Sequence, residues 1–178
     1  MPRGVKRGGG GAASTGEARR LEAWDAALRL LAMRARTTQE VRQGLARQGH
    51  PPADIAAVIL RLTSEKYLDD LEFARTWVRS VGLRRARGPA RLAQELRAKG
   101  VGEAEIAAAL SDLPAAGSIL DVAEEAAVRK LKGLRGMDPT VARRRLAAHL
   151  ERQGFPADAI LVVCREHFPA EAEHEGGP

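Results

Sequence analysis

The sequence predicts an all-α protein made of tandem three-helix repeats, because one spacing pattern occurs three times. Each copy has two apolar residues four positions apart, then a glycine four positions later, then an apolar residue six positions beyond that glycine. The copies are Val41, Leu45, Gly49 and Ile55; Leu92, Leu96, Gly100 and Ile106; and Leu146, Leu150, Gly154 and Ile160. A preserved spacing with a period of about fifty residues is typical of repeat architectures.

Each copy of the pattern has the same structural interpretation. Apolar residues four apart share one face of a helix. A glycine four residues later suits the left-handed backbone that often ends a helix. The next apolar residue then starts the buried face of a following helix. Three such units in a row indicate an elongated helical binding protein.

Composition and a Pro- and Gly-containing interruption predict the domain boundaries. The chain begins with Gly-rich, basic sequence and finishes with acidic sequence, and Pro114 to Gly117 interrupts the pattern between the second and third copies. We therefore expect a flexible basic tail over 1–16, repeat one over 17–64, repeat two over 65–113, repeat three over 118–166 and an acidic disordered tail over 167–178.

Capping signals predict where individual helices start. Thr37 is followed three residues later by Glu40, as in a capping box. Asp138 directly precedes Pro139, which places an N-cap residue before a proline at the first helical position. Gly88 and Pro89 give a similar restart in the second repeat.

Asp69 and Asp70 form an adjacent carboxylate pair, which is also a possible catalytic arrangement. No His, Lys or metal-spaced partner accompanies the pair. Asp69 with Glu72 instead fits a second capping box, and both acids complement the positive end of a helix. Capping is therefore the favoured interpretation.

Composition and charge point to binding and not to chemistry. Aromatic residues make up only 3% of the chain, which suits several small cores better than one large one. The formal net charge is +6 and the isoelectric point is about 10.2, which favours a polyanionic partner or an acidic protein surface. The alternative is compositional drift in an Arg- and Ala-rich proteome.

Several classes of function find no support in the sequence. The single cysteine, Cys164, allows no intramolecular disulfide and occupies a predicted core position. The glycines from Gly8 to Gly11 lack the features of a phosphate-binding loop, and no histidine has metalloenzyme spacing. No apolar run reaches membrane-spanning length and no secretory signal is evident. We expect a cytoplasmic protein that is not an enzyme and has no metal or cofactor.

Basic residues gather on corresponding flanks of the aligned repeats. Seven bases against Glu95 alone occur between Arg79 and Lys99, and Arg91 and Arg145 occupy equivalent positions. The alternative is an ordinary solvated helix face. The predicted partner-binding or nucleic-acid-binding residues are Arg79, Arg84, Arg85, Arg87, Arg91, Arg144, Arg145 and Arg152. The Ala-rich second helices offer few groups that could read bases, so sequence-specific DNA recognition is weakly supported.

A distinctive order and spacing of residues runs through 67–101. Its members are Tyr67, Leu68, Asp69, Asp70, Phe73, Ala74, Trp77, Val78, Gly88, Arg91, Leu92, Glu95, Leu96, Lys99, Gly100 and Val101. This segment closely resembles the RecX family of bacterial regulatory proteins. The similarity extends more loosely from about Ala27 to Cys164. The predicted structural motif of the family comprises Tyr67, Asp69, Asp70, Phe73, Trp77, Gly88, Leu96 and Gly100.

The resemblance implies a curved, elongated string of three-helix repeats that binds the RecA filament on single-stranded DNA. It further implies inhibition of recombinase, ATPase and co-protease activities, and so modulation of recombinational DNA repair and the SOS response. We expect a monomer with no membrane partner. The alternatives are a standalone, nonspecific binder of single- or double-stranded nucleic acid and, more distantly, a helical adaptor unrelated to DNA.

Overall fold

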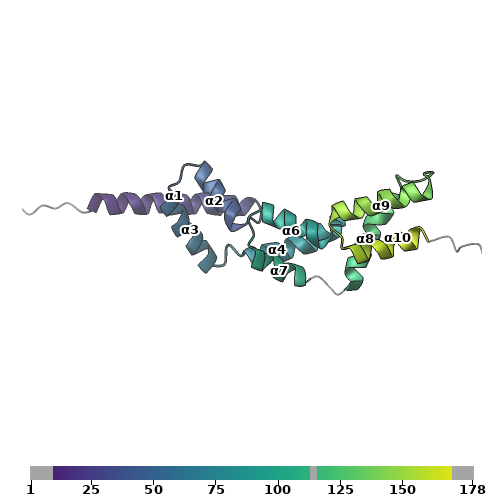
Figure 1. Ribbon diagram of the computed structural model, residues 1–178. Helices are drawn as coiled ribbons and strands as arrows, with labels where there is room; N and C mark the ends of the chain where they lie inside the picture. The colour runs from purple at the N-terminus through teal and green to yellow at the C-terminus, as the bar shows by residue number, and fades with distance from the viewer. Residues whose placement is uncertain (1–9, 113–115, 170–178) are drawn as a thin grey trace, which may run out of the picture. The chain divides into compact units, whose positions relative to one another are not determined.

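The computed structural model describes residues 10–112 and 116–169, and these residues form helices and no strand (Figure 1). The chain divides into two compact units, residues 1–73 and 74–178, and each is described by itself. The predicted all-α class is confirmed. Within the described residues, no helix combines the length and the apolar character that a membrane crossing requires.

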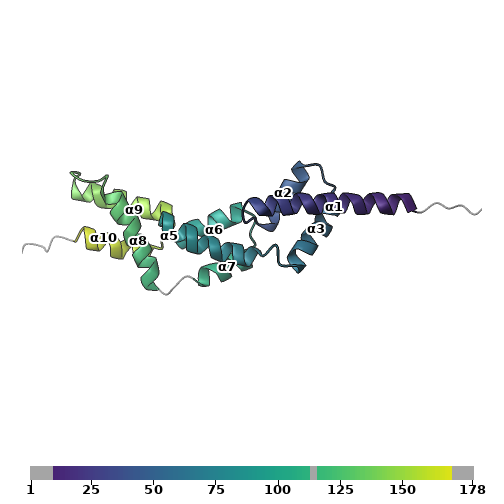
Figure 2. The same ribbon diagram turned by 180° about the vertical axis from the view of Figure 1, so that it is seen from behind.

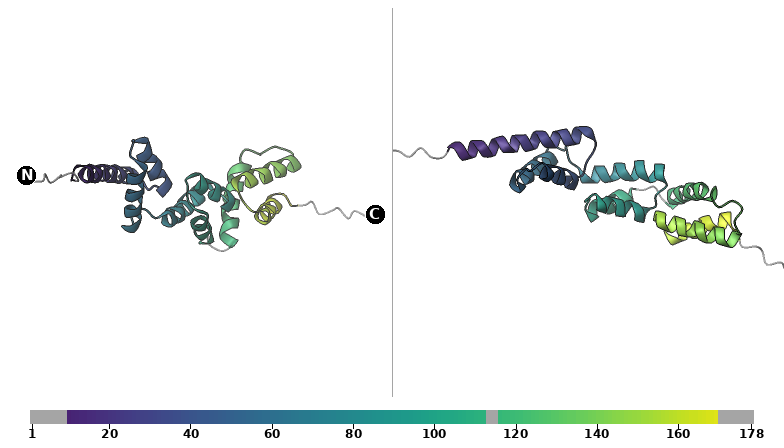
Figure 3. Two further views of the ribbon diagram at one scale, coloured as in Figure 1. Left: turned by 60° about the vertical axis from the view of Figure 1, so that its left-hand side comes forward. Right: turned by 90° about the horizontal axis from the view of Figure 1, so that it is seen from above.

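The first unit contains α1 (Gly10–Met33), α2 (Thr38–Arg47) and α3 (Pro52–Ser64). The long α1 has α2 and α3 packed along its second half (Figure 3, right). Alanines of α1 allow this close approach, and β-branched residues and leucines of the other helices fill the core. The buried core residues are Ala23, Ala26, Ala27, Val41, Leu45, Ile55, Val58, Ile59, Leu62 and Leu68.

The first helix begins earlier than the sequence analysis predicted. It starts at Gly10, inside the expected tail over 1–16, in a stretch where Ala12 and Ala13 are the residues of high helix propensity. The rest of the predicted basic tail, residues 1–9, lies outside the described residues.

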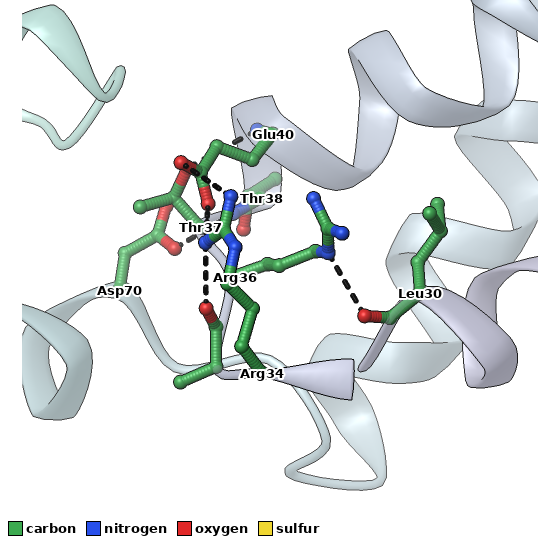
Figure 4. A network of polar contacts seen from close by, with 8 residues as sticks. Leu30, Arg34, Arg36, Thr37, Thr38, Glu40 and Asp70 are labelled. Carbon is green, nitrogen blue, oxygen red and sulfur yellow. Dashed lines mark hydrogen bonds and ion pairs between the residues drawn. The ribbon is translucent and has the colours of Figure 1, made fainter. Parts of the chain in front are cut away.

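A capping network joins the start of α2 to the start of α4 (Asp70–Trp77) (Figure 4). The backbone N–H of Glu40 donates to the Thr37 hydroxyl at 3.1 Å, and that of Glu72 donates to Asp69 Oδ1 at 3.0 Å. Both predicted N-caps are therefore confirmed. Asp70 has a role that the sequence did not indicate. Its Oδ1 accepts a hydrogen bond from the backbone N–H of Thr38, at the start of α2, at 2.8 Å. A cap of this kind contributes about 1 kcal/mol.

The second unit contains the rest of α4 and the remaining helices. After a π-helical turn (Val78–Gly82) come α5 (Leu83–Arg85), α6 (Pro89–Ala98) and α7 (Glu103–Ser111). The third triad consists of α8 (Ala116–Leu131), α9 (Pro139–Gln153) and α10 (Ala157–His167). The core of this triad comprises Ala86, Ala123, Ala126, Ala127, Leu134, Ala142, Leu146, Leu150, Phe155, Val163 and Cys164.

The glycine pattern that predicted the repeats marks real helix ends. Gly49, Gly100 and Gly154 have φ of 84°, 77° and 84°, in the left-handed region where a side chain is strained. Each follows a helix, as predicted. The paired apolar residues of all three copies are buried, and Ile160 is partly buried against the third core.

Two predicted boundaries differ from the structure. The chain remains helical through His167, and Phe168 packs against the third core, so the predicted acidic tail over 167–178 starts too early. Helix α8 begins at Ala116, inside the predicted interruption at Pro114 to Gly117, and residues 113–115 lie outside the described part of the chain. Residues 170–178 lie outside it as well, and the other boundaries stay predictions.

Cys164 occupies the core position that its spacing predicted. The residue is only 2% exposed. Burial raises the pKa of its thiol, and Arg143 opposes that effect. The side chain is therefore a small buried thiol and not an activated nucleophile.

Candidate functional site

The beginning of α6 and the end of α9 meet through their backbones (Figure 2). Gly88 N–H donates to Gln153 O at 2.8 Å, and Ala90 N–H donates to Gly154 O at 3.2 Å. These N–H groups at the start of α6 and these carbonyls at the end of α9 are backbone groups that have no partner within their own helix. A Cβ built on Gly88 would overlap the backbone of Gly154, so the start of α6 and the end of α9 approach each other closely at a site where only glycine fits.

The segment just before α6 is anchored in the third core. Ala86 is 1% exposed and belongs to the buried cluster of α8, α9 and α10. Its φ of 47° turns the backbone there. Anchoring Ala86 places the arginines on either side of it against α8 and α9.

These arginines line an open pocket of about 550 Å³. We call it the basic pocket. Its lining comprises Arg84, Arg85, Ala86, Arg87, Ala126, Arg129, Lys130, His149 and Gln153. The lining contains no carboxylate, so the pocket concentrates positive charge from three separate parts of the chain.

Hydrogen bonds and ion pairs hold some of these cations in place. Arg84 Nε donates to Ser80 O at 2.8 Å. Arg129 donates to Arg84 O at 3.1 Å and is paired with Glu125, four residues earlier on α8. Arg87 Nη1 lies 3.3 Å from Glu95 Oε1. These contacts hold Arg84, Arg87 and Arg129 in position in the wall of the basic pocket.

Two other cations of the basic pocket are uncompensated. Arg85 and Lys130 have no ion pair within the described part of the chain. Arg85 is exposed and Lys130 is half-buried. Guanidinium and ammonium groups in such a setting bind phosphate or carboxylate oxygens through charge-assisted hydrogen bonds.

The positive potential of the basic pocket acts on His149. Its pKa lies below the ordinary histidine value, first because of burial and then because of Lys130 and Arg152. Arg152, a predicted site residue, is therefore close enough to influence this pocket electrostatically.

An anion in the basic pocket should raise the pKa of His149. A negative charge offsets the repulsion from Lys130 and Arg152 and stabilises the imidazolium. Anion binding should accordingly strengthen as the pH falls through the pKa of His149. We would titrate the imidazole by NMR with and without inorganic phosphate, using His50 in the first unit as the internal control. A titration midpoint of His149 that ignores phosphate would contradict the site.

The remaining predicted binding residues do not join the basic pocket. Arg91 Nε lies 3.4 Å from Glu95 Oε1. Arg144 lines a different depression with Ala147, Ala148, Glu151, Phe155, Ala157 and Ile160. Arg145 Nη1 contacts Met137 Sδ at 3.4 Å, and Arg79 lies 3.4 Å from the Thr76 hydroxyl. The roles of all eight predicted residues stay predictions, and the structure brings only Arg84, Arg85 and Arg87 into one pocket.

Sequence reasoning missed Arg129, Lys130 and His149. A signal for the first two was present, since residues 129–135 carry Arg129, Lys130, Lys132 and Arg135 with no acid among them. Basic residues are also expected at the C-terminal end of a helix, because they complement the helix dipole. The run alone therefore does not indicate a binding role.

The predicted structural motif has mixed roles. Tyr67 is 56% exposed and stands edge-on to Trp24, with ring centroids 6.1 Å apart. The Lys99 ammonium lies 4.4 Å from the centroid of the Trp77 ring. Leu96 is fully buried. Phe73 is partly buried in the first turn of α4, and Asp69, Asp70, Gly88 and Gly100 have the capping, docking and helix-ending roles described above.

Known proteins match this chain in sequence and in fold. Residues 23–62 match the model of the first RecX three-helix domain, and residues 69–110 match that of the second. A "Regulatory protein RecX" of Halorhodospira halophila is 40% identical over 156 residues, covering 86% of this chain and 91% of the relative. One of Mycolicibacterium vanbaalenii is 38% identical over 152 residues, covering 82% of each chain.

Solved structures agree on the fold. A crystal structure of a regulatory protein RecX superposes with a TM-score of 0.82 at 21% identity, covering 92% of this chain and 82% of that one. That of RecX from Lactobacillus salivarius gives a TM-score of 0.77 at 20% identity, covering 84% of this chain and 97% of that one. With two matched domains and relatives aligned along most of their length, this chain belongs to the RecX family of regulatory proteins.

Proposed function

We propose that this protein binds RecA nucleoprotein filaments and inhibits their recombinase, ATPase and co-protease activities. It would thereby modulate recombinational DNA repair and the SOS response. The observation that carries this proposal is membership of the RecX regulatory family across most of the chain. The protein acts by binding, in the cytoplasm, as a monomer, and without a cofactor or a membrane partner.

The basic pocket supports the proposal physically. Single-stranded DNA in a RecA filament carries backbone phosphates, and protein surfaces carry carboxylates. Arg85 and Lys130 are available for either kind of oxygen, and Arg84 and Arg129 shape the wall around them. Their common charge attracts such a surface over long range and speeds association.

A second function is supported by the same cations. Uncompensated Arg85 and Lys130 would also suit a standalone, nonspecific nucleic-acid-binding protein, because phosphate contacts alone supply most nonspecific affinity. The two functions differ in whether RecA is required.

Binding to labelled single-stranded DNA, measured with and without RecA over a range of salt concentrations, separates the two functions. A filament regulator should bind the RecA-coated strand at concentrations where its own DNA binding is negligible. Nonspecific binding should weaken with salt equally in both cases, with a logarithmic slope of about −0.7 per phosphate contacted. Binding that is no tighter when RecA is present would overturn the proposed function and leave the alternative.

A further inference from the structure

A second cavity lies in the third triad, at the opposite end of α9 from the basic pocket. It is an open groove of about 1070 Å³ between the end of α8, the 132–138 loop, the start of α9 and the residues after α10. Val128, Leu131, Leu134, Met137 and Phe168 give it apolar walls. We call it the triad-three groove.

Three cations of the triad-three groove are without ion-pair partners. Lys132, Arg135 and Arg143 line it, all three are exposed, and none forms an ion pair with a residue in 10–112 or 116–169. The acidic residue of the lining, Asp138, is engaged as the N-cap of α9, where it accepts from Val141 N–H at 3.0 Å. The groove therefore combines a net positive charge with apolar walls.

Another titratable group of the triad-three groove is already engaged. His167, which lines the groove, has its Nε2 2.7 Å from Oε1 of Glu124 on α8. This contact leaves Lys132, Arg135 and Arg143 as the groups with unused charge.

An acidic segment follows the last residue of the triad-three groove directly in the sequence. Pro169, the last described residue, lines the groove. Residues 170–178 follow directly and carry Glu171, Glu173 and Glu175 without any Lys or Arg. In an extended chain, residues two positions apart point to the same side, so the three carboxylates are spaced to face one surface together.

We propose that segment 170–178 docks intramolecularly in the triad-three groove, with its glutamates against Lys132, Arg135 and Arg143. An extended chain covers about 3.3–3.6 Å per residue, so the segment can span the groove from Pro169. Docking would cover cations that otherwise add to the attraction for polyanions. The device is thus an autoinhibitory contact, and it does not depend on the identity of the partner.

Tethering makes a weak contact sufficient. A short flexible connection gives an effective concentration in the millimolar range, so a contact with a dissociation constant of about 1 mM is roughly half occupied. Because the charges are exposed, salt should screen them, with a Debye length of about 8 Å at 0.15 M ionic strength.

Paramagnetic broadening in the full chain tests the docking. A nitroxide is attached at His174→Cys in a Cys164→Ala background, and broadening of backbone amide signals is recorded by NMR. The buried thiol of unaltered Cys164 offers a second background if that substitution disturbs the fold. We expect broadening over residues 131–143, with at least a twofold loss on adding salt. The same loss should follow Glu171→Gln, Glu173→Gln and Glu175→Gln together.

Charge reversals inside and outside the groove and a mixing experiment make the test decisive. Lys132→Glu with Arg135→Glu should abolish the broadening, whereas Arg144→Glu, which lines a different depression, should leave it unchanged. Broadening confined to other surfaces, or none above the high-salt level, overturns the proposal. In a mixed sample, broadening of the amide signals of a copy without the nitroxide also overturns the proposal. The occupant of the groove would then be a second chain.

Discussion

Replacing Gly154 by alanine should lower the free energy of unfolding by about 3 kcal/mol or more, whereas the same change at Gly49 should cost about 1 kcal/mol. The two glycines have the same φ of 84°, so the backbone strain of an added Cβ is matched. Around Gly49 that Cβ would meet no atom within 4 Å. At Gly154 it would overlap the backbone of Arg91, at the start of α6.

The difference between the two variants isolates the contact between α6 and α9. Neither backbone can move aside without lengthening the bonds from Gly88 N–H to Gln153 O and from Ala90 N–H to Gly154 O, each contributing about 1 kcal/mol. Chemical denaturation followed by circular dichroism measures both variants beside the parent. Equal losses at positions 49 and 154 would show that α6 and α9 do not meet as described.

Reversing Arg85 and Lys130 to glutamate should weaken binding to the RecA filament by roughly tenfold at low salt. The free energy of unfolding should fall by about 1 kcal/mol or less, because Lys130 lies in the last turn of α8, where a cation complements the helix dipole. Both side chains lack ion pairs within the described residues, so their replacement breaks no bond of the fold. The salt dependence of binding should fall as well, because fewer counterions are released.

A control of equal charge is available on the same protein. Arg144→Glu with Arg145→Glu changes the net charge by the same amount but lies outside the basic pocket. Binding of both double variants would be measured by fluorescence anisotropy on a labelled filament, with circular dichroism as the check on folding. If the control loses as much affinity as the pocket variant, net charge and not the basic pocket determines binding.

The sequence predicted those parts of the fold that depend on local chemistry. Gly49, Gly100 and Gly154 end helices because a left-handed residue after a helix strongly favours glycine, and that preference is visible in one chain. Thr37, Asp69 and Asp138 cap helices through bonds to N–H groups three residues later. Each of these predictions needed only neighbouring residues.

What the sequence left out depends on contacts between distant residues. Asp70 accepts from Thr38, and Gly88 donates to Gln153, across separations that no local pattern encodes. The basic pocket has the same origin, because burial of Ala86 in the third core brings the arginines around it to Lys130 and His149. The flank alignment grouped Arg91 with Arg145, yet these side chains contact Glu95 and Met137 and do not share the pocket.

Inhibition of RecA-catalysed ATP hydrolysis on single-stranded DNA tests the central claim most directly. Increasing amounts of this protein would be added to preformed filaments at a salt concentration where it does not bind the bare strand. We predict a saturating fall in the hydrolysis rate for the parent, and the same fall only at roughly tenfold higher concentration for Arg85→Glu with Lys130→Glu. A hydrolysis rate that stays constant up to stoichiometric excess over RecA would contradict the assignment of this protein as a filament regulator.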